Sequence, residues 1–546
     1  MGRKTRMNGR LRVIAYENSI EIPLTEACFF GFFILLSVTK GLGLYEGQKL
    51  FELLVIPAFL FAVLKILNTP YTKRQWVMQI LFLFLTAIVF INSHERGILF
   101  LAFTVLGMKN ISVKKVFHVG LWVWSICSIV LSIFSFFRLE HTVYRVHEKM
   151  GLGHIFRWSL GFTHPNILHI TYLALCAFIL YELGDGYRLK HFIYLMAGNI
   201  LIFLYSVSYT GFGIVSVLLA GCLYVQFRPK FCFVEKVLMN LVFPVCLALS
   251  FIAPFYLYDN KYAAKVQRLN FILNTRILLA EQFLRSEYHS LFGADISKIV
   301  QSSMTLDNSY VWGYINYGLI PISIIVLGYF VLLFYDTHKQ KTRELMILVC
   351  FLGAGWTEQL LFNTSFKNVT LIFLGSLLFM QKDGAKEYCL FPQMQRTVVI
   401  PFVGLPKRLY TVARSVWRRC RMKIVGWSAF GIVLGIVLCA VLYTAPVGYV
   451  VPRFYTDGKD QTFVYVESRN DPPYEGWKIM NYTDADTQMQ LIQGKAITLE
   501  TVRYYVGSAL IGGLCGMTAG IIYYGLKQHS TDKESGGKVK MVGVHD

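Results

Sequence analysis

Residues 138–183 read RLEHTVYRVHEKMGLGHIFRWSLGFTHPNILHITYLALCAFILYEL, and this stretch contains the pattern that decides the fold. Its first part, 138–166, is polar and basic, whereas 167–183 is an apolar run. A helix needs about 20 mostly apolar residues to cross a bilayer, and comparable runs follow one another along the chain between polar loops. The stretch therefore predicts a membrane-spanning helix that begins directly after a polar loop.

The composition supports a membrane protein. Hydrophobic residues make up 55% of the 546 residues, charged residues make up 16%, and the mean hydropathy is +0.50. A soluble protein of this size could not bury so much apolar surface. The net charge of +21 lies mostly in short loops between apolar spans, so membrane topology explains it better than nucleic-acid binding does, and we expect no nucleic-acid partner.

The apolar runs predict an all-α polytopic membrane protein, with about 12 transmembrane helices in residues 1–390 and two more in the C-terminal part. The run at 97–109 is short for a span, and Ser208, Tyr209 and Thr210 interrupt the run 191–226. The predicted spans are 22–39, 50–67, 76–92, 97–109, 117–137, 167–183, 191–207, 211–226, 237–257, 311–335, 344–362, 369–380, 424–443 and 504–525.

The charges of the loops predict the orientation. Strongly basic loops alternate with weakly basic ones, and basic loops remain in the cytoplasm. This asymmetry puts both termini inside and two long loops, 138–166 and 258–310, outside. The two loops nevertheless contain Arg138, Arg145, Arg157, Arg268, Arg276 and Arg285. They therefore predict a site for a large anionic ligand outside the membrane.

The chain changes character after the first domain, 1–390. Residues 391–423 form a basic cytoplasmic linker whose apolar residues recur at helical spacing. This spacing is typical of an amphipathic helix on an anionic membrane surface, and a solvated basic stretch is an equal alternative. Residues 424–546 form a second unit, in which two spans flank an external segment, 444–503.

Glycines recur at four-residue spacing in both C-terminal spans. The last span contains Gly512, Gly516 and Gly520, and the preceding one contains Gly431 and Gly435. Small residues at this spacing let two helices approach closely. They predict packing of the two spans against each other, or a homo-oligomer formed through Gly512, Gly516 and Gly520.

The strongest cluster of candidate functional residues ends the first outer loop. Pro165 suits the first turn of the following helix, which leaves His164 at a helix N-terminus, where an anion is favoured. Arg157 could contact a phosphate with two hydrogen bonds, and His164 could act as a general base or a donor. The alternative is a helix cap with an interfacial arginine and histidine.

The second outer loop offers Arg276. Its position at helical spacing among leucines puts its charge near an apolar face, so it needs an acid such as Glu281 or a bound anion as partner. The cluster Asp307-Asn308-Ser309-Tyr310 precedes the next span, and Asp307 alone could be an N-cap.

Glu358 lies near the outer end of the predicted span 344–362. An ionisable residue within a span is costly and indicates a function. Glu358 could pair with an arginine of the long loops or bind a sugar hydroxyl, and the alternative is an interfacial acid without a role.

Taken together, residues 1–390 resemble the Wzy-type polysaccharide polymerases. The likeness rests on the number of spans, the two long outer loops and a set of motifs. These motifs are Arg157 with Gly161, His164 and Asn166 in an Arg…Gly-Phe-x-His-Pro-Asn pattern, the later Arg276, and Asp307, Asn308 and Tyr310 before a span.

The resemblance implies a GT-C-like glycosyltransferase in the bacterial plasma membrane. Its substrate would be an oligosaccharide linked to undecaprenyl pyrophosphate, and a flippase and a chain-length regulator would be its partners. Arg157 and Arg276 would bind the pyrophosphate together with Asn166, Asp307, Asn308 and Tyr310, and His164 or Glu358 would act on the acceptor hydroxyl. No cofactor or metal is expected, because arginines can neutralise the leaving group.

The C-terminal unit 424–546 resembles a shortened chain-length regulator of the Wzz/CpsC type, and a family-specific appendage is the alternative. Two other functions stay open for the whole chain. One is an O-antigen-ligase-like transfer of the finished glycan to another acceptor. The other, a flippase for lipid-linked sugar, is less favoured because the ionisable residues gather at the outer face.

Overall fold

The computed structural model describes residues 20–137, 144–149, 153–259, 264–272, 276–286, 289–296, 306–380, 386–391, 396–400, 405–443, 449–454, 461–466, 490–491 and 495–539. These residues fold mainly as helices, and 11 of the helices are long and apolar enough to cross a membrane. This confirms the expectation of a polytopic, α-helical membrane protein. The long helices are α2 (Leu24–Gly41), α3 (Lys49–Asn68), α4 (Lys73–Ser93), α6 (Val113–Phe137), α7 (Pro165–Leu183), α8 (Leu189–Ser206), α9 (Tyr209–Phe227), α10 (Phe233–Phe251), α15 (Leu319–His338), α18 (Leu405–Leu442) and α20 (Lys495–Val539).

Shorter helices replace several of the predicted spans. The run at 97–109 forms α5 (Gly97–Gly107), 369–380 forms α17 (Thr370–Leu378), and 344–362 forms α16 (Thr342–Gly355). The glycines near the end of α16 favour an early stop because glycine is a poor helix former. Glu358 therefore lies in the turn after α16. The span prediction, which put this residue within a helix, is wrong here.

Two other predicted spans are each divided in two. Gly318, at φ 83°, separates α14 (Ser309–Tyr317) from α15. Ile252 separates α10 from α11 (Ala253–Asp259), where Pro254 lies in the first turn, a position at which its missing N–H costs nothing. The breaks make α11 and α14 short helices of their own beside α10 and α15.

The chain forms two compact units. The first, which we call the helical unit, comprises residues 24–145 and 157–396, and the second, the C-terminal unit, comprises 1–23, 146–156 and 397–546. The helical unit has a core rich in aromatic side chains, and its peripheral helix α4 exposes Ile80 and Phe84. Such exposed apolar faces suit contact with lipid.

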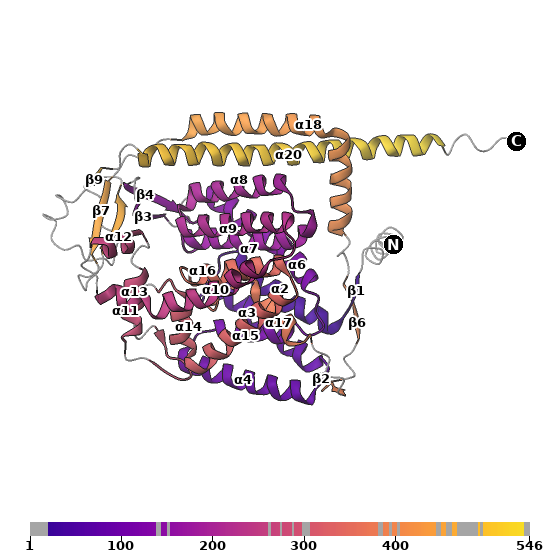
Figure 1. Ribbon diagram of the computed structural model, residues 1–546. Coiled ribbons are helices and arrows are strands. Elements are labelled where there is room, and N and C mark those ends of the chain that lie inside the picture. The colour runs from indigo at the N-terminus through magenta and orange to yellow at the C-terminus, as the bar shows by residue number, and fades with distance from the viewer. Residues whose placement is uncertain are drawn as a thin grey trace. The chain divides into compact units, whose positions relative to one another are not determined.

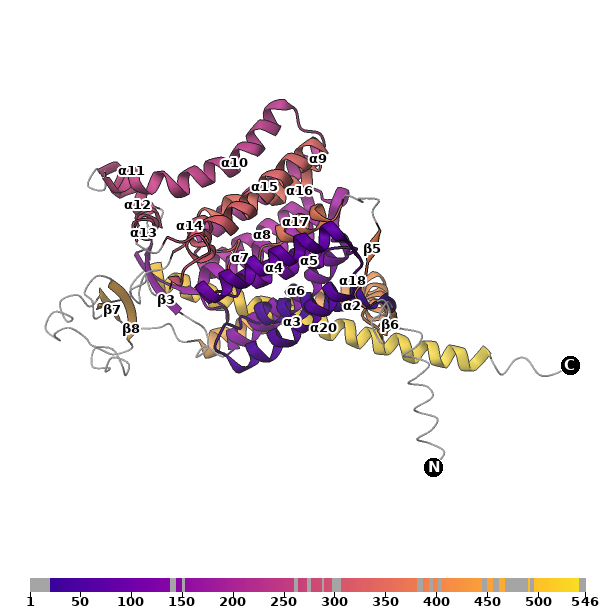
Figure 2. The ribbon, with the colours of Figure 1, turned by 90° about the horizontal axis from the view of Figure 1, so that it is seen from below.

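The residues of the second predicted outer loop lie at one end of the helical unit. They form α12 (Ala264–Ile272) and α13 (Arg276–Leu284), which lie beside α11, as Figure 2 shows. Helix α10 packs beside α15 and leads to this end (Figure 2).

In the C-terminal unit, α18 and α20 pack side by side (Figure 1). A Cβ atom on Gly431 would overlap the carbonyl of Gly512, and one on Gly516 would overlap the carbonyl of Trp427. The glycine pattern is thus used between two helices of one chain, and a homo-oligomer stays a prediction. Non-helical backbone angles at Cys420 bend α18 between its basic first half and its apolar second half (Figure 1).

The C-terminal unit also contains strands that the all-α expectation did not include. A five-stranded sheet has the order β4-β3-β8-β7-β9, and Val146 of the first outer loop lies opposite Phe463. The runs of valine and aromatic residues in β7 and β8 favour strands. The sheet consists of β3 (Tyr144–Lys149), β4 (Gly153–Trp158), β7 (Tyr449–Phe454), β8 (Gln461–Val466) and β9 (Gln490–Leu491).

Two strand pairs lie near the linker. Strand β1 (Ile20–Pro23) pairs with β6 (Thr397–Ile400), and β2 (Tyr71–Thr72) pairs with β5 (Glu387–Tyr388). Both chain ends lie outside the described residues, and so does most of the segment 444–503. The prediction of cytoplasmic termini concerns these chain ends.

Candidate functional site

The candidate site lies where six elements of the helical unit begin or end: α7, α8, α9, α13, α14 and α16. Residues from both predicted outer loops and from the turn after α16 meet there. Helix termini carry unsatisfied backbone groups, so polar side chains are expected to gather at such a place.

Arg157 is held by the ends of two helices. Its Nε donates to the carbonyl of Ser206 at 2.7 Å, and its Nη2 donates to Oδ1 of Asn166 at 2.5 Å. The turn between Arg157 and Asn166 depends on Gly161 at φ 87°, and a Cβ there would overlap Oγ of Ser135. Glycine at this position therefore lets the chain fold back so that Arg157 reaches the first turn of α7.

Glu358 is the centre of the network. Its Oε1 accepts hydrogen bonds from Oγ1 of Thr210 at 2.8 Å, from Nη2 of Arg276 at 2.8 Å and from Nδ2 of Asn166 at 3.3 Å. Asn166 thus links Glu358 to Arg157. Of the two arginines, one from each predicted outer loop, Arg276 binds this carboxylate directly and Arg157 reaches it through Asn166.

Arg276 also contacts a second acid. Its Nε lies 3.3 Å from Oδ2 of Asp307, and its Nη1 lies 3.4 Å from Oγ1 of Thr210. Glu281, which the sequence offered as an alternative partner, forms its ion pair with Arg285 instead. The side chain of Arg276 is 10% exposed and that of Glu358 is 9% exposed, so the pair is largely shielded from water.

The Asp-Asn-Ser-Tyr cluster has four different roles. Asp307 binds Arg276, and the N-cap of α14 is Asn308, whose Oδ1 accepts from the backbone N–H groups of Tyr310 at 2.9 Å and Val311 at 3.0 Å. The suggestion that Asp307 is the cap is therefore wrong. Tyr310 is fully buried and its hydroxyl donates to the carbonyl of Leu352 at 2.5 Å, which indicates a role in packing rather than in ligand contact.

Ser309 fixes the turn that carries Glu358. Its Oγ donates to the carbonyl of Glu358 at 2.6 Å and accepts from the backbone N–H groups of Leu360 at 3.0 Å and Leu361 at 3.2 Å. Irregular backbone at the depth of a membrane must be satisfied by such internal bonds. Ser309 thus holds the backbone of Glu358 in place.

His164 is the N-cap of α7. Its Nδ1 accepts from the backbone N–H of Asn166 at 3.1 Å, as the capping alternative predicted. In the neutral ring the proton then lies on Nε2. In this state His164 can donate a hydrogen bond to an anion. The group near the arginines that can accept a proton is the carboxylate of Glu358.

The two arginines and the two acids balance each other in charge. Burial and the nearby Glu358 raise the pKa of the Asp307 carboxyl, Arg276 and Arg157 lower it, and the net result is a pKa of about 6. Asp307 therefore changes its charge just below neutral pH.

Thr210, Ser206 and His169 join this region although no sequence motif indicated them. Thr210 stands in the first turn of α9, and His169 is fully buried with its Nδ1 3.1 Å from Oγ of Ser206. The signal for Thr210 was the polar break Ser208-Tyr209-Thr210 between two apolar runs.

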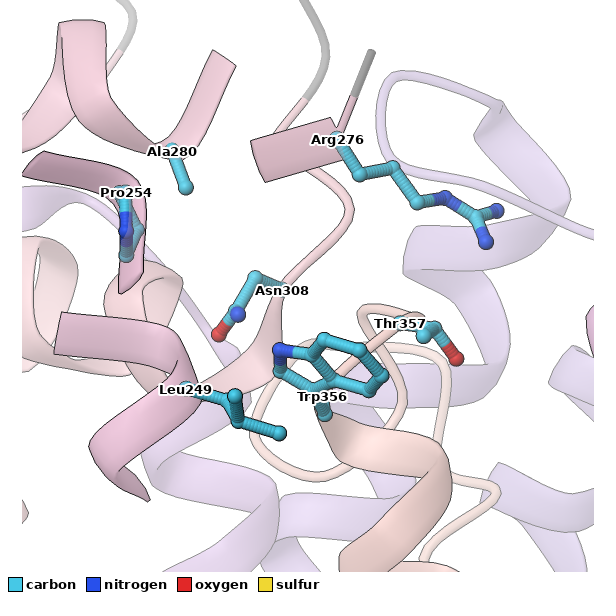
Figure 3. Close-up of a pocket in the computed structure, with 7 residues that line it drawn as sticks. All are labelled: Leu249, Pro254, Arg276, Ala280, Asn308, Trp356 and Thr357. Carbon is cyan, nitrogen blue, oxygen red and sulfur yellow. The ribbon is translucent and has the colours of Figure 1, made fainter. Parts of the chain in front are cut away.

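A pocket opens on the Arg276 side of the network (Figure 3). It combines apolar and aromatic walls with polar groups, a mixture that is usual in ligand-binding pockets. Its lining residues are Leu249, Pro254, Arg276, Ala280, Asn308, Trp356 and Thr357.

Comparison of the chain with known proteins gave no match among family models, curated proteins or solved structures. Within the part of the chain that the structure describes, no three His, Cys, Asp or Glu side chains are placed to hold a metal ion.

Proposed function

We propose that the protein polymerises oligosaccharide repeat units, carried on undecaprenyl pyrophosphate, into a surface polysaccharide at the outer face of the bacterial plasma membrane. The observation that carries the proposal is the joining of Arg157, Asn166, Arg276 and Glu358 in one hydrogen-bonded network. The resemblance to Wzy-type polymerases implies that both arginines bind the pyrophosphate and that His164 or Glu358 acts on the acceptor hydroxyl.

The arginines suit a pyrophosphate leaving group. In the reaction, the oxygen of an acceptor hydroxyl forms a bond to the anomeric carbon of the donor sugar. The bond between this carbon and the phosphate oxygen breaks, and the electron pair leaves with the pyrophosphate. Planar guanidinium groups bind phosphate oxygens with two parallel hydrogen bonds, and they stabilise the charge that develops on the leaving group.

Glu358 is the proposed base for the hydroxyl proton. In the network its Oε1 accepts three hydrogen bonds, from Thr210, Arg276 and Asn166. When a pyrophosphate binds Arg276, Glu358 loses the bond at 2.8 Å that this arginine donates. Binding of the donor would in this way free a lone pair of Glu358 to accept a hydrogen bond from the acceptor hydroxyl.

The pocket beside Arg276 is the proposed place for the groups next to the pyrophosphate. The indole of Trp356 provides a flat apolar surface of the kind on which sugars and isoprenoid units pack. The pyrophosphate would lie at the Arg276 end, where Asn308 adds a polar group to the pocket lining.

Deletion of the gene, with analysis of the surface glycan, tests the proposal. A polymerase mutant retains single repeat units and loses long chains. Long chains that accumulate on the lipid carrier would instead indicate a ligase, and repeat units trapped inside the cell would indicate a flippase.

A further inference from the structure

The turn between α8 and α9, residues 206–210, contacts both arginines of the network. The carbonyl of Ser206 accepts from Nε of Arg157 at 2.7 Å, and Oγ1 of Thr210 accepts from Nη1 of Arg276 at 3.4 Å. The hydroxyl of Thr210 also donates to the central carboxylate of the network at 2.8 Å. One short turn therefore sets how the two guanidinium groups lie relative to this carboxylate.

The backbone of this turn is strained at Val207. This residue follows the last turn of α8 and lies in the left-handed region, at φ 42° and ψ 49°. Left-handed angles are rare for a β-branched residue, because its side chain crowds the backbone, and glycine or asparagine is the usual residue at such a place. A strained conformation persists only where the surrounding structure holds it. Contacts around the turn must therefore offset the energy that the strain costs.

His169 of α7 binds the side chain of the residue at which the turn begins. Its Nδ1 lies 3.1 Å from Oγ of Ser206, and its Nε2 lies 2.8 Å from Oδ1 of Asn199. The Nδ2 group of Asn199 donates to the carbonyl of Phe212 at 3.1 Å and to Oγ of Ser216 at 3.0 Å, so its Oδ1 is free to accept from His169. A charged ring is costly at this fully buried position. In the neutral ring Nε2 carries the proton, and Nδ1 accepts from the hydroxyl of Ser206.

The ring of His169 also lies against the start of α9. A Cβ atom on Gly211 would be 2.6 Å from Cγ of His169 and 2.8 Å from its Cβ. Gly211 follows Thr210 directly, and the absence of a side chain at 211 lets the first turn of α9 approach the ring this closely. His169 thus reaches both ends of the turn: the hydroxyl of Ser206 at the α8 end and the backbone of Gly211 at the α9 end.

An aromatic contact joins the same turn to Arg157. Trp158 follows Arg157 in the chain, and Tyr205 precedes Ser206. Both rings are buried, and they meet edge to face with their centres 5.6 Å apart. The segments 157–158 and 205–206 are therefore held together by a hydrogen bond and by a ring contact, so a displacement of the turn also displaces the guanidinium of Arg157.

We infer that His169 is a positioning residue for the pyrophosphate-binding arginines. It holds the strained turn 206–210 through Ser206 and Gly211, and the turn in its place presents Arg157 to the ligand in a fixed geometry. His169 is fully buried and acts on the ligand only through these neighbours. The inference rests on the proposed function, because it assumes that the arginines of the network bind a pyrophosphate.

The test measures the affinity of the full-length protein in lipid nanodiscs for farnesyl pyrophosphate. Ser206→Ala removes the hydroxyl that bonds to His169 but keeps the carbonyl that binds Arg157, and it should weaken binding about fivefold. Thr171→Val is the matched control. Thr171 is a buried residue of α7 whose hydroxyl bonds within its own helix, to the carbonyl of Ile167 at 2.8 Å, so this variant should bind the probe with wild-type affinity.

A double-mutant cycle separates positioning from a general loss of packing. In the Arg157→Ala background, Ser206→Ala should weaken binding no further, because the group that it positions is gone. His169→Phe keeps an aromatic ring but cannot accept from Ser206, so it should weaken binding as much as Ser206→Ala does, with no added effect in the double variant. Ser206→Ala and Thr171→Val each lose one buried hydrogen bond and should unfold at similar temperatures.

Wild-type affinity in Ser206→Ala would overturn the inference, and so would a loss of affinity that persists in the Arg157→Ala background. Equal weakening in Thr171→Val would also contradict it, since the loss of any buried hydrogen bond would then have the same effect. If His169→Phe does not fold, the cycle of Ser206 with Arg157 decides alone. The proposed function fails in a different way: a wild-type protein that does not bind the probe, or an Arg157→Ala variant that binds it with wild-type affinity, refutes the arginine site and the inference with it.

Discussion

The Nη2 atom of Arg276 lies 2.8 Å from Oε1 of Glu358, although 82 residues separate the two in the chain. The contact joins the second predicted outer loop to the turn after α16. Both side chains are about nine-tenths buried, so loss of either partner breaks an ion pair that is shielded from water.

Arg157→Ala and Arg276→Ala should each abolish long polysaccharide while the protein still reaches the membrane. The reason is the loss of a guanidinium that neutralises the leaving group. Gel analysis of surface polysaccharide, alongside immunoblots of the membrane fraction, measures both effects. Arg268→Ala, an exposed arginine of the same loop, is the control and should leave the polymer unchanged.

Lysine at either position should restore little polymer, because the two-pronged geometry of the guanidinium is lost. Normal polymer in both alanine variants would exclude these arginines from the site.

Glu358→Gln should fold and yet polymerise at least about 100-fold more slowly, because the amide keeps an acceptor for Thr210 and Arg276 but cannot take up a proton. Glu358→Ala should in addition lower the free energy of unfolding by about 1–3 kcal/mol, since it leaves Arg276 with only its longer contact to Asp307. Polymerisation rates and denaturant unfolding of the purified variants check both values. A Gln variant with a wild-type rate would remove Glu358 from the role of base.

Polymerisation should decline as the pH falls through about 6, where Asp307 takes up a proton and its ion pair with Arg276 is lost. The pH profile of Asp307→Asn should lack this step. The free energy of unfolding should depend on pH in the opposite direction to the polymerisation rate. The pKa of Asp307 is higher in the folded protein than the ordinary 3.8, so its contribution to stability is complete below 3.8 and is lost as the pH rises through about 6. Identical pH profiles for the wild-type protein and the Asn variant would contradict this assignment.

Tyr310→Phe should destabilise the protein by about 1 kcal/mol, because it removes the hydrogen bond to the carbonyl of Leu352. The polymerisation rate should stay near that of the wild type, since the hydroxyl faces the core. Thermal unfolding and rate measurements on the same preparation separate the two effects. A loss of rate without a loss of stability would assign Tyr310 to the substrate.

Gly512→Val should separate α18 from α20, because a side chain there would overlap the carbonyl of Gly431. If the C-terminal unit regulates chain length, polymer is still made but its length distribution changes. Gly426→Val, at a glycine of α18 with open space around it, is the control. An unchanged length distribution in Gly512→Val, with the helices shown to be apart by cysteine cross-linking, would favour the appendage alternative.

Much of the fold could be predicted from the sequence because membrane spans require long apolar runs. The divisions at Gly318 and Ile252, and the early end of α16, could not, because each depends on local backbone geometry inside an apolar run. The sheet was missed for another reason: Val146 and Phe463 are far apart in the chain, and pairing between distant strands leaves no signal in one sequence.

The candidate site was predictable residue by residue but not as a network. A buried charge is costly, and this made Arg276 and Glu358 candidates. The polar break at Thr210 is visible in the sequence, but its partner Glu358 is 148 residues away, and this contact could be found only in three dimensions. The sequence likewise suggested Asp307 as the N-cap of α14. In the structure Asn308 is the N-cap and Asp307 binds Arg276.

The most direct test of the central claim is polymerisation by the purified protein in liposomes, with an undecaprenyl-pyrophosphate-linked repeat unit as the sole substrate. We predict a ladder of longer glycans with the wild-type protein and with Arg268→Ala, and only single repeat units with Arg276→Ala. A ladder of the same length and amount from Arg276→Ala, or no ladder from the wild-type protein with the repeat unit of its own organism, would contradict the account.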